Sequence, residues 1–458
     1  MDKLQYTESL NTSYAIDGFR SLRNFKITLR PGINVLVGPN GSGKTNFIEF
    51  LDFLDNVIRQ GASAAVSSAG GVARVFSIED NKRSSPTVTA RVEALAEIVF
   101  PRPEPSEPPS RKVFNFEYEI EIKFSRSSSA IYISREVLRL RKLRSSEETN
   151  VAASLVGGIT LIRRSASEEE KPRTFVGPRL FTDNERNPLN SRTPYLNRSA
   201  KETLSRLDFV LMPDESFLSP RSSIQAVDSV RYALSRGRSF NIIPARAREP
   251  DDLTRIPAIQ RDGAGLSATL HNMQTAQSRP QSGRRSSSVR RRVPRDSLAM
   301  VIEWTKLVFP ELQQIQVAQD PHTGKYLVHL IVGSEDPIRL PLQAASDGTV
   351  KWLAFVALII SSGTTYSVEE PENFLHPKMQ QFLIQLIRDA PYRSGEDYFI
   401  LSTHSETLIN QCIPEELILF SFDGATSCHR LSDPEQVQKE INRTGFGLGY
   451  YYASNSLS

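Results

Sequence analysis

Hydrophobic and polar positions alternate most regularly in VFNFEYEIEIKF, residues 113–124. One face of this segment would carry Phe114, Phe116, Tyr118, Ile120, Ile122 and Phe124. A two-residue period predicts a strand with one buried face, as in an antiparallel sheet. The segment IYISREVLRLRK, residues 131–142, follows a serine-rich turn and is expected to be its partner strand.

A different pattern surrounds residues 33–58. INVLV, residues 33–37, is apolar apart from Asn34 and is a candidate for a buried strand. TNFIEFLDFLDNVI, residues 45–58, places its apolar residues at helical spacing. A glycine-rich stretch separates the two, so strand, loop and helix follow one another in that order.

The C-terminal part of the chain alternates between predicted helices and strands. Helices are expected at 266–274, 297–309, 348–362 and 378–390, and strands at 325–332, 364–370 and 397–403. No internal repeat and no sustained heptad pattern is present, which argues against a long coiled-coil arm.

Residues 277–295 are rich in serine and arginine and contain almost nothing apolar, which predicts a mobile loop. Its arginines are Arg279, Arg284, Arg285, Arg290, Arg291, Arg292 and Arg295. Such a run is either a solvated loop or a set of phosphate contacts to nucleic acid. It lacks aromatic residues for base stacking, so any DNA binding would be without sequence preference.

Composition narrows the class of protein only slightly. The 458 residues are 39% hydrophobic and 24% charged, which is ordinary for a globular protein, and the net charge of +4 does not by itself indicate nucleic acid. Cys412 and Cys428 lack metal-ligand spacing and are expected to be free thiols. We see no charged leader with an apolar core, and the apolar run at 353–360 is too short to cross a bilayer, so we expect a cytoplasmic protein without membrane contact.

The stretch GPNGSGKT, residues 38–45, matches the phosphate-loop motif G-x-x-x-x-G-K-[ST] in its required place between a strand and a helix. Backbone amides of such a loop wrap phosphate oxygens, and the helix N-terminus favours the negative charge. Lys44 would reach the β- and γ-phosphates of ATP, and Thr45 would offer its hydroxyl to Mg²⁺. The expected nucleotide-binding residues are Gly38, Pro39, Asn40, Gly41, Ser42, Gly43, Lys44, Thr45 and Asn46.

The stretch YSVEEPENFLHP, residues 366–377, contains three carboxylates around a proline. Adjacent residues at a strand end point in different directions, so the first two acids can have different roles. Glu369 is expected to hold Mg²⁺, and Glu370 to orient or deprotonate the attacking water. Glu372 would lie on the connector to a helix that begins near Pro377; its ordinary interpretation is a solvated or salt-bridged loop acid.

Four segments together resemble a known family: LRNFKITLRPGINVLVGPNGSGKTN, ASDGTVKWLAF, SVEEPENFLHP and LSTHS. Their order resembles the ABC-type ATPases related to RecF, SMC proteins and the overcoming-lysogenization-defect (OLD) ATPases. It is most similar to the prokaryotic subgroup with an EEPE..LHP Walker B motif, which includes AAA-type ATPase subunits of phage-defence systems such as Septu, PARIS and some retrons. The motifs cover both ends of the chain, whereas the middle resembles the family only in pattern.

The resemblance implies roles for further residues. SDGT, comprising Ser346, Asp347, Gly348 and Thr349, corresponds to the ABC signature motif, which acts in trans on the γ-phosphate held by another protomer. Ser346 or Asp347 can also simply cap the helix that follows. His404 corresponds to the switch histidine that senses the γ-phosphate. His376 corresponds to the loop that connects protomers, although packing or capping is an equally good interpretation.

The implied fold is α/β: an ABC-type P-loop ATPase head with a mixed sheet, plus an inserted antiparallel-β and helical region. We expect the core to be split between residues 1–80 and 298–458, with the insertion at 81–297. Only 54 residues follow His404, too few for the Toprim nuclease domain of OLD proteins. The resemblance thus implies an ATPase that is not itself a nuclease, assembles with itself, and controls a separate effector such as a nuclease in an anti-phage complex. The alternative is a DNA-binding ATPase of the RecF or SMC type in DNA repair or maintenance.

Overall fold

The computed structural model describes residues 11–77, 86–100, 110–142, 158–164, 173–176, 211–220, 225–235, 238–277, 296–362, 366–389, 398–454 and 456. The chain forms two compact units. Unit 1 comprises Met1–Pro31, Gly38–Gly237 and Phe420–His429, and unit 2 comprises Gly32–Val37, Arg238–Leu419 and Arg430–Ser458. The division of the chain predicted from the sequence, an ATPase core with an insertion at 81–297, stays a prediction.

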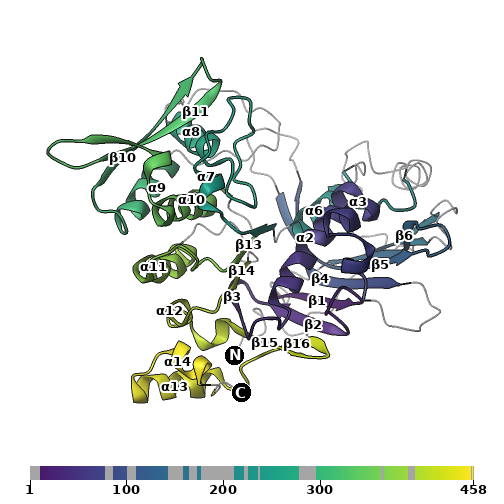
Figure 1. The fold of residues 1–458 in the computed structure, drawn as a ribbon. Coiled ribbons are helices and arrows are strands. Elements are labelled where there is room, and N and C mark those ends of the chain that lie inside the picture. Colours follow the sequence, from purple (N-terminus) through teal and green to yellow (C-terminus); the bar gives the residue numbers. More distant parts are fainter. Residues whose placement is uncertain are drawn as a thin grey trace. The chain divides into compact units, whose positions relative to one another are not determined.

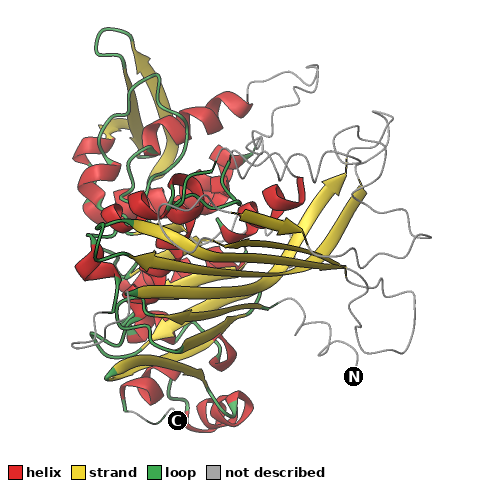
Figure 2. Ribbon diagram, turned by 90° about the vertical axis from the view of Figure 1, so that its right-hand side faces the viewer, coloured by secondary structure: helices red, strands yellow, loops and turns green. Residues whose placement is uncertain are grey.

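Unit 1 is built on an antiparallel seven-stranded sheet in the order β2-β1-β4-β5-β6-β7-β8. Figure 2 shows its longest strands as extended yellow ribbons. The strands are β1 (Thr12–Asp17), β2 (Phe25–Leu29), β4 (Thr87–Phe100), β5 (Ser110–Phe124), β6 (Ile131–Lys142), β7 (Gly158–Arg164) and β8 (Arg173–Val176).

The alternating pattern of β5 buries one face of this sheet, as predicted. Phe116 and Tyr118 are fully buried, and β6 pairs antiparallel with β5. On the other face, Arg139 Nη1 contacts a carboxylate oxygen of Glu117 at 2.6 Å and one of Glu119 at 2.9 Å. The predicted strand pair is therefore confirmed, and ion pairs across neighbouring strands stabilise its polar face.

The helices of unit 1 are α2 (Lys44–Gln60), α3 (Ala62–Ser68), α4 (Val72–Val75) and α6 (Gln225–Leu234). The apolar stripe of α2 packs on the β1–β2 region. The ring of Phe19 lies 5.4 Å from that of Phe50 and 5.1 Å from that of Phe53. Phe25 similarly meets Phe47 at 5.8 Å. Burial of these aromatic rings fixes the helix that follows the phosphate loop.

Unit 2 contains parallel strands in the order β15-β3-β14-β13-β9. They are β3 (Gly32–Val37), β9 (Arg238–Phe240), β13 (Tyr366–Glu369), β14 (Tyr398–Ser402) and β15 (Leu417–Asp423). β15 continues into unit 1, where a turn at Gly424 leads to the neighbouring strand β16 (Ala425–Arg430). Ile33, Asn34, Val35, Leu36 and Val37 of β3 are all buried, as expected for a strand inside a parallel sheet.

A small antiparallel sheet, β10-β11-β12, also belongs to unit 2, formed by β10 (Leu312–Asp320), β11 (Lys325–Val332) and β12 (Ile338–Pro341). The helices of this unit are α7 (Pro244–Ala247), α8 (Leu266–Gln277), α9 (Ser297–Lys306), α10 (Asp347–Ser362), α11 (Pro377–Arg388), α12 (Glu406–Ile409), α13 (Pro434–Thr444) and α14 (Leu448–Ala453), with short 3-10 helices at Leu342–Ala344 and Pro414–Glu416.

Helix α10 lies at the centre of the apolar core of unit 2, beside α9 and α7 (Figure 1). Its residues from Val350 to Ile360 are buried all round. Trp352 is fully buried, and its indole N–H donates to the carbonyl of Trp304 on α9 at 3.2 Å. The sequence predicted a helix here, and its burial on every side makes it a core helix.

The expected α/β architecture, with a phosphate loop between a parallel strand and a helix, is confirmed. Strand β10 was not predicted because a bulge between Leu312 and Gln314 interrupts its alternation. The C-terminal aromatic segment forms α14 and packs on α12.

The predicted arginine-rich loop at 277–295 lies outside the described residues, apart from Gln277. Among the residues described, no helix has the length and apolar character that a membrane span requires.

Candidate nucleotide-binding site

Three parallel strands of unit 2 bring the predicted site residues to one edge of the sheet. The register aligns Leu36 of β3 with Ser402 of β14, and Ser402 with Glu369 of β13. Neighbouring strands lie about 4.8 Å apart, so these positions form one short row at the carboxyl ends of the strands. Beyond that row, β13 continues to Glu370, β14 to His404, and β3 into the phosphate loop at Gly38.

The phosphate loop in unit 1 has the backbone that an anion site requires. Gly43 has φ 99°, and a Cβ there would lie 2.0 Å from the Thr426 hydroxyl oxygen. At Gly38, with φ 153°, a Cβ would lie 2.3 Å from the carbonyl oxygen of Phe420. Only glycine fits both positions. Helix α2 then starts without a side-chain cap, which leaves its first amides for a ligand.

Lys44 is buried against its own loop. Its Nζ donates to the carbonyl oxygens of Gly38 at 2.8 Å and Pro39 at 3.1 Å, and lies 3.4 Å from the hydroxyl of Ser42. Thr45, by contrast, is exposed, as are Asn40 and Gly41. An ammonium, uncapped helix amides and an accessible hydroxyl are a donor set that suits a phosphate with an attached Mg²⁺.

The side chain of Asn46 is held by the β1–β2 loop of the same unit. Its amide donates to the Ser21 hydroxyl at 2.6 Å and accepts from Arg20 at 3.4 Å. Arg20 also forms an ion pair with Glu49 on α2. Asn46 therefore anchors the first turn of α2 through its side chain, and only its backbone remains for the expected phosphate contact.

Glu369 ends β13 beside an arginine that the sequence did not single out. Nη2 of Arg261 lies 3.3 Å from Oε1 of Glu369. The Glu369 side chain is only 12% exposed, whereas that of Arg261 is 51% exposed. The carboxylate expected to hold Mg²⁺ thus has a cationic partner in Arg261.

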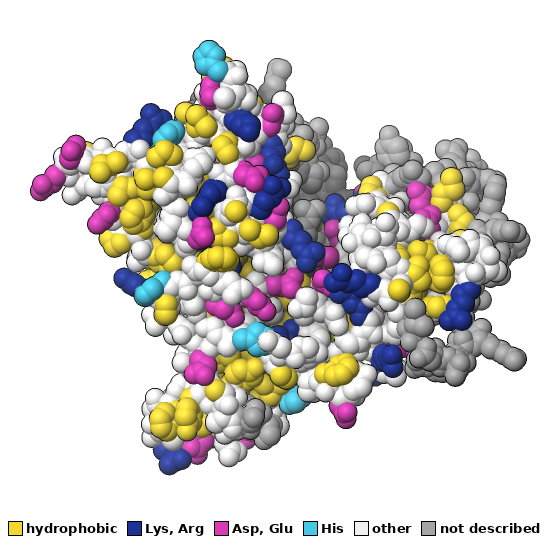
Figure 3. All heavy atoms as spheres, in the orientation of Figure 1, with side chains coloured by type: hydrophobic (Ala, Val, Ile, Leu, Met, Phe, Trp, Pro, Cys, Tyr) yellow, Lys and Arg dark blue, Asp and Glu magenta, His cyan; other side chains and the backbone are white. Residues whose placement is uncertain are grey.

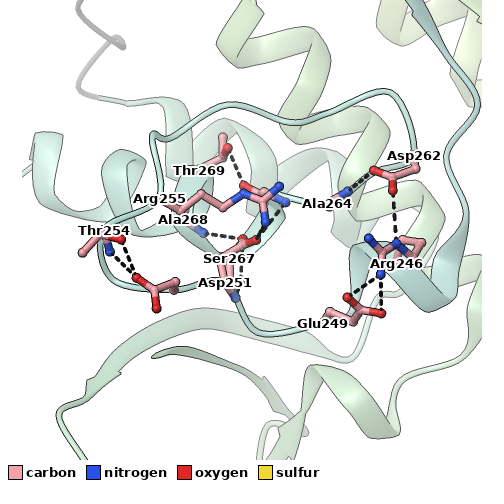
Figure 4. Close-up of polar contacts among 12 residues, drawn as sticks. Arg246, Glu249, Asp251, Thr254, Arg255, Asp262, Ala264, Ser267, Ala268 and Thr269 are labelled. Carbon is pink, nitrogen blue, oxygen red and sulfur yellow. Dashed lines mark hydrogen bonds and ion pairs between the residues drawn. The ribbon is translucent and has the colours of Figure 1, made fainter. Parts of the chain in front are cut away.

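A fixed loop presents Arg261. Its carbonyl accepts from the amide of Asn241, just after β9, at 2.8 Å, and the amide of Ile243 donates to the next carbonyl, that of Asp262, at 3.0 Å. The Asp262 side chain accepts from Arg246 Nε at 3.1 Å and from the Ala264 amide at 3.1 Å (Figure 4). The position of the Arg261 backbone is therefore set by hydrogen bonds with the segment that directly follows β9.

The buried carboxylate of Asp251 secures the other end of this loop (Figure 4). It accepts from the amides of Gly265 at 3.0 Å and Ala268 at 3.1 Å and from the Ser267 hydroxyl at 2.8 Å. Arg255 adds an ion pair at 3.0 Å. An acid that satisfies the first amides of α8 fixes where the loop enters the helix.

Glu370 has an unusual backbone for a glutamate, with φ 42°. Its amide donates to the carbonyl of Ser402 at 3.0 Å, and its carboxylate accepts from the Asn373 side-chain amide at 3.1 Å. A left-handed non-glycine residue at a strand end is a mark of functional sites. The two adjacent acids have different partners, Arg261 for Glu369 and Asn373 for Glu370, and the different roles predicted for them stay predictions.

Glu372 is not the solvated loop acid that its ordinary interpretation suggests. Its Oε1 accepts from the Thr403 hydroxyl at 2.8 Å and from the backbone amide of His404 at 2.9 Å. Its Oε2 is buried and accepts no hydrogen bond from the described residues. Glu372 therefore fixes the segment that carries His404, which places His404 beside the acid-bearing turn.

The signature segment caps and starts α10. The Ser346 hydroxyl accepts from the Thr349 amide at 3.2 Å and lies 2.8 Å from the Thr349 hydroxyl, so the predicted capping interaction is present. The Asp347 carboxylate accepts from Arg248 Nη2, and the same nitrogen donates to the Ala345 carbonyl at 3.2 Å. Ser346 itself is exposed and remains accessible to a partner molecule.

His376 caps a helix, which is one of the two interpretations that the sequence offered for it. Its Nδ1 accepts from the amide of Lys378 at 3.3 Å at the start of α11, whose first residue is Pro377, as predicted.

Sequence reasoning missed four contributors to this region: Arg248, Arg261, Lys351 and the clamping role of Glu372. The only visible signal was Lys351, a lone cation inside the otherwise apolar segment 350–360.

The three glutamates do not form a metal site by themselves. In the part of the chain that the structure describes, no group of three or more His, Cys, Asp or Glu side chains is placed to hold a metal ion. Mg²⁺ in nucleotide sites commonly has one or two protein ligands, with phosphate oxygens and water completing the shell. Glu369, a single carboxylate at the end of β13, is a protein ligand of the kind that such a site uses.

Comparison with known proteins gives several similarities. Over 76 residues the chain is 37% identical to the DNA replication and repair protein RecF of Beutenbergia cavernae; the match covers 16% of this chain and 19%, about a fifth, of that protein. Among solved structures, an Smc head bound to the C-winged helix domain of ScpA has a TM-score of 0.43 at 14% identity and covers 92% of this chain and 97% of its own. The SMC head domain of Thermotoga maritima has a TM-score of 0.36 at 12% identity, covering 92% and 98% respectively.

A family match covers far more of the sequence. Residues 33–410 match the model of the family described as "AAA domain, putative AbiEii toxin, Type IV TA system". The matched region begins in β3, includes the phosphate loop, the signature segment and the acid cluster, and ends just after α12. Since the match spans well over half of the chain, this protein belongs to that family of AAA-domain ATPases.

Proposed function

We propose that this chain binds and hydrolyses ATP as an ABC-type ATPase and uses the cycle to control a separate effector. The observation that carries the proposal is the row Leu36–Ser402–Glu369. It brings the strand that leads into the phosphate loop alongside the strands that end in Glu369–Glu370 and His404. An ATPase needs an acid for the metal, an acid for water and a group that contacts the γ-phosphate, and the segments at the ends of β13 and β14 carry a candidate for each.

Lys44 would bind the β- and γ-phosphates once it exchanges the loop carbonyls for phosphate oxygens. Thr45 and Glu369 would hold Mg²⁺, which when bound neutralises charge on the phosphate oxygens. Glu370 would orient and deprotonate the attacking water, and His404 would contact the γ-phosphate. Much of the rate would come from positioning.

The accessible Ser346 at the start of α10 supports a site completed by a second copy of the chain. A helix N-terminus with an exposed hydroxyl is suited to an anion. We propose that Ser346, Asp347, Gly348 and Thr349 contact the nucleotide held by another protomer, so that ATP drives dimerisation or a higher assembly.

The effector would be a separate protein, most concretely a nuclease or toxin in an anti-phage complex. The family description names a toxin of a toxin–antitoxin system, which favours a role in such conflict systems. Tagged full-length chain co-expressed with its neighbouring gene product should retain that product, and Glu370→Gln should abolish protection of cells against phage. A chain that retains no partner and shows no phage phenotype would end the effector proposal while leaving the ATPase proposal intact.

The alternative is an ATPase of the RecF or SMC type that acts on DNA. The 76-residue similarity to RecF and the arginine run at 279–295 favour it. On the face drawn in Figure 3, Lys and Arg side chains are interspersed with Asp and Glu, so the described residues of that face form no broad basic field.

Replacement of the seven arginines by serine separates the two proposals. If the chain controls a protein effector, its affinity for duplex DNA and the salt dependence of that affinity should not change. If it is a DNA-binding ATPase, the slope of log K against log salt should fall by about 0.9 for each phosphate group that the arginines had neutralised. A salt titration of fluorescent duplex DNA binding measures both quantities.

Arg261→Ala should lower the Mg²⁺ concentration required for half-maximal ATP hydrolysis. The arginine competes with the metal for Glu369, and an exposed ion pair is worth up to about 1 kcal/mol, so a shift of about two- to fivefold is expected. Arg443→Ala, which removes an exposed arginine on α13, is the matched control. A higher Mg²⁺ requirement would contradict the competition and would instead place Arg261 on the nucleotide.

A further inference from the structure

Lys351 lies one turn into the signature helix α10, within the apolar core of unit 2. Its side chain is 1% exposed. Nζ donates to the backbone carbonyl of Asn373 at 2.8 Å and lies 5.6 Å and 5.7 Å from the ring centroids of Phe355 and Phe374. The carbonyl oxygen and the faces of the two aromatic rings each attract a positive charge, so this place in the core suits a cation.

Burial of a lysine ammonium costs free energy, because the charged form loses its hydration. Burial lowers the pKa of Lys351 to about 8, although the carboxylates of Glu372 and Glu370 act in the opposite direction. An apolar residue of the same length would fill this place in the core without that cost. A costly charge directly after the signature segment and close to two acids is a candidate for a functional role.

A second contact joins the same two segments. A Cβ on Gly348 would lie 2.8 Å from the carbonyl oxygen of Phe374, so only glycine allows this close approach. Residues three apart lie on one face of a helix, so Gly348 and Lys351 meet the Asn373–Phe374 turn together. Helix α10 thus contacts the turn at two adjacent backbone carbonyls, those of Asn373 and Phe374.

The held turn is the one that carries the candidate catalytic groups. The side-chain amide of Asn373 donates to the Glu370 carboxylate at 3.1 Å, and its backbone amide donates to the Glu370 carbonyl at 3.3 Å. Between them in sequence, Glu372 accepts from Thr403 and from the amide of His404. A displacement of Asn373 would therefore reach both Glu370 and the His404 segment.

We propose that Lys351 is a positioning residue that ties the signature helix to the turn carrying Glu370 and, through Glu372, to His404 of the same chain. The inference rests on the proposed function and deepens it. When Ser346 engages a nucleotide on another copy, any shift of α10 is transmitted to the acid and histidine of its own chain. Hydrolysis in one site would thus depend on assembly at the other.

Lys351→Met tests the proposal because it keeps the length of the side chain and removes only the cationic donor. Lys306→Met, a partly exposed lysine on α9 of the same unit, is the matched control. In the nucleotide-free protein, hydrogen exchange measured over residues 370–376 should be faster in Lys351→Met than in wild type and in the control. This measurement does not depend on ATP hydrolysis.

In the presence of ATP and Mg²⁺, Lys351→Met should lower kcat by about tenfold or more, the scale of a lost charged hydrogen bond. The affinity for ATP should stay within about twofold of wild type, because the phosphate loop is unchanged. Lys351→Arg, which keeps a cationic donor, should recover much of the turnover. Since Asn373 is exposed, Asn373→Ala is not expected to disturb folding, and it should also lower kcat.

The double variant Lys351→Met/Asn373→Ala decides whether the two residues act together. If Lys351 acts through the turn, the double variant should have about the kcat of the slower single variant. The inference would be overturned if the kcat losses of the two single variants multiplied in the double variant. It would also be overturned if Lys351→Met had wild-type kcat or unchanged hydrogen exchange over residues 370–376. Absence of ATP hydrolysis in wild type would instead overturn the proposed function, and the exchange result would still stand.

Discussion

Glu370→Gln is expected to bind ATP with wild-type affinity and to hydrolyse it about 10²- to 10⁴-fold more slowly, the range for loss of a general base. Glutamine can still accept from the Asn373 amide through its carbonyl oxygen, so the local hydrogen bond of Glu370 is kept. What it cannot do is take a proton from water. The expected consequence is that ATP accumulates in the closed assembly.

Two measurements check this result. Single-turnover hydrolysis should show the slow chemical step, and light scattering after size exclusion should show a larger species in ATP and Mg²⁺ than without nucleotide. Glu335→Gln, an exposed acid in the same unit, should behave as wild type. Wild-type turnover in Glu370→Gln would remove Glu370 from the role of base.

Lys44→Ala is expected to abolish ATP binding at concentrations that saturate wild type. Its ammonium is the only side-chain cation of the described phosphate loop, residues 38–46, and charged hydrogen bonds contribute about 1.5–3 kcal/mol each. Removal of the ammonium from two phosphates corresponds to at least about a hundredfold weaker affinity. Isothermal titration with ATP measures it directly, and Lys26→Ala, an exposed lysine on β2, is the control.

Mixing variants extends this test to the trans role of the signature segment. Lys44→Ala has no working phosphate loop but keeps its signature, whereas Ser346→Arg keeps its loop but blocks its signature. If the signature acts in trans, the two inactive proteins mixed together should regain a fraction of wild-type turnover through one intact composite site. No recovery in a mixture that forms heterodimers would exclude the trans arrangement.

Among the expected features, the local ones were predictable because short-range chemistry determines them. The order strand, phosphate loop and helix follows from apolar periodicity and glycine spacing, and the structure has it at β3, residues 38–43 and α2. The eight apolar residues predicted for α2 are all buried. The strand pair β5–β6 follows likewise from its two-residue period.

Other features depend on contacts between residues far apart in the chain, which no local pattern encodes. Glu372 clamps His404 across 32 positions, and Arg261 reaches Glu369 across 108. In sequence, Glu372 resembles an ordinary loop acid, and Arg261 one arginine among many. Their positions are determined by the parallel pairing of β9, β13 and β14, which sets the strand ends side by side.

By itself, the sequence determined the class of chemistry: a phosphate loop, two adjacent acids after a strand, and a capped segment before an apolar helix. These features rest on the identity and spacing of a few neighbouring residues, which do not depend on how distant segments of the chain pack. Only the tertiary structure decided how those pieces are connected. The register of three strands aligns Leu36, Ser402 and Glu369, and the packing of α10 places a buried ammonium, Lys351, on the turn that carries Glu370. Burial and register are properties of the whole packed chain, and for that reason the contact between α10 and the turn that carries Glu370 could not be predicted from the sequence.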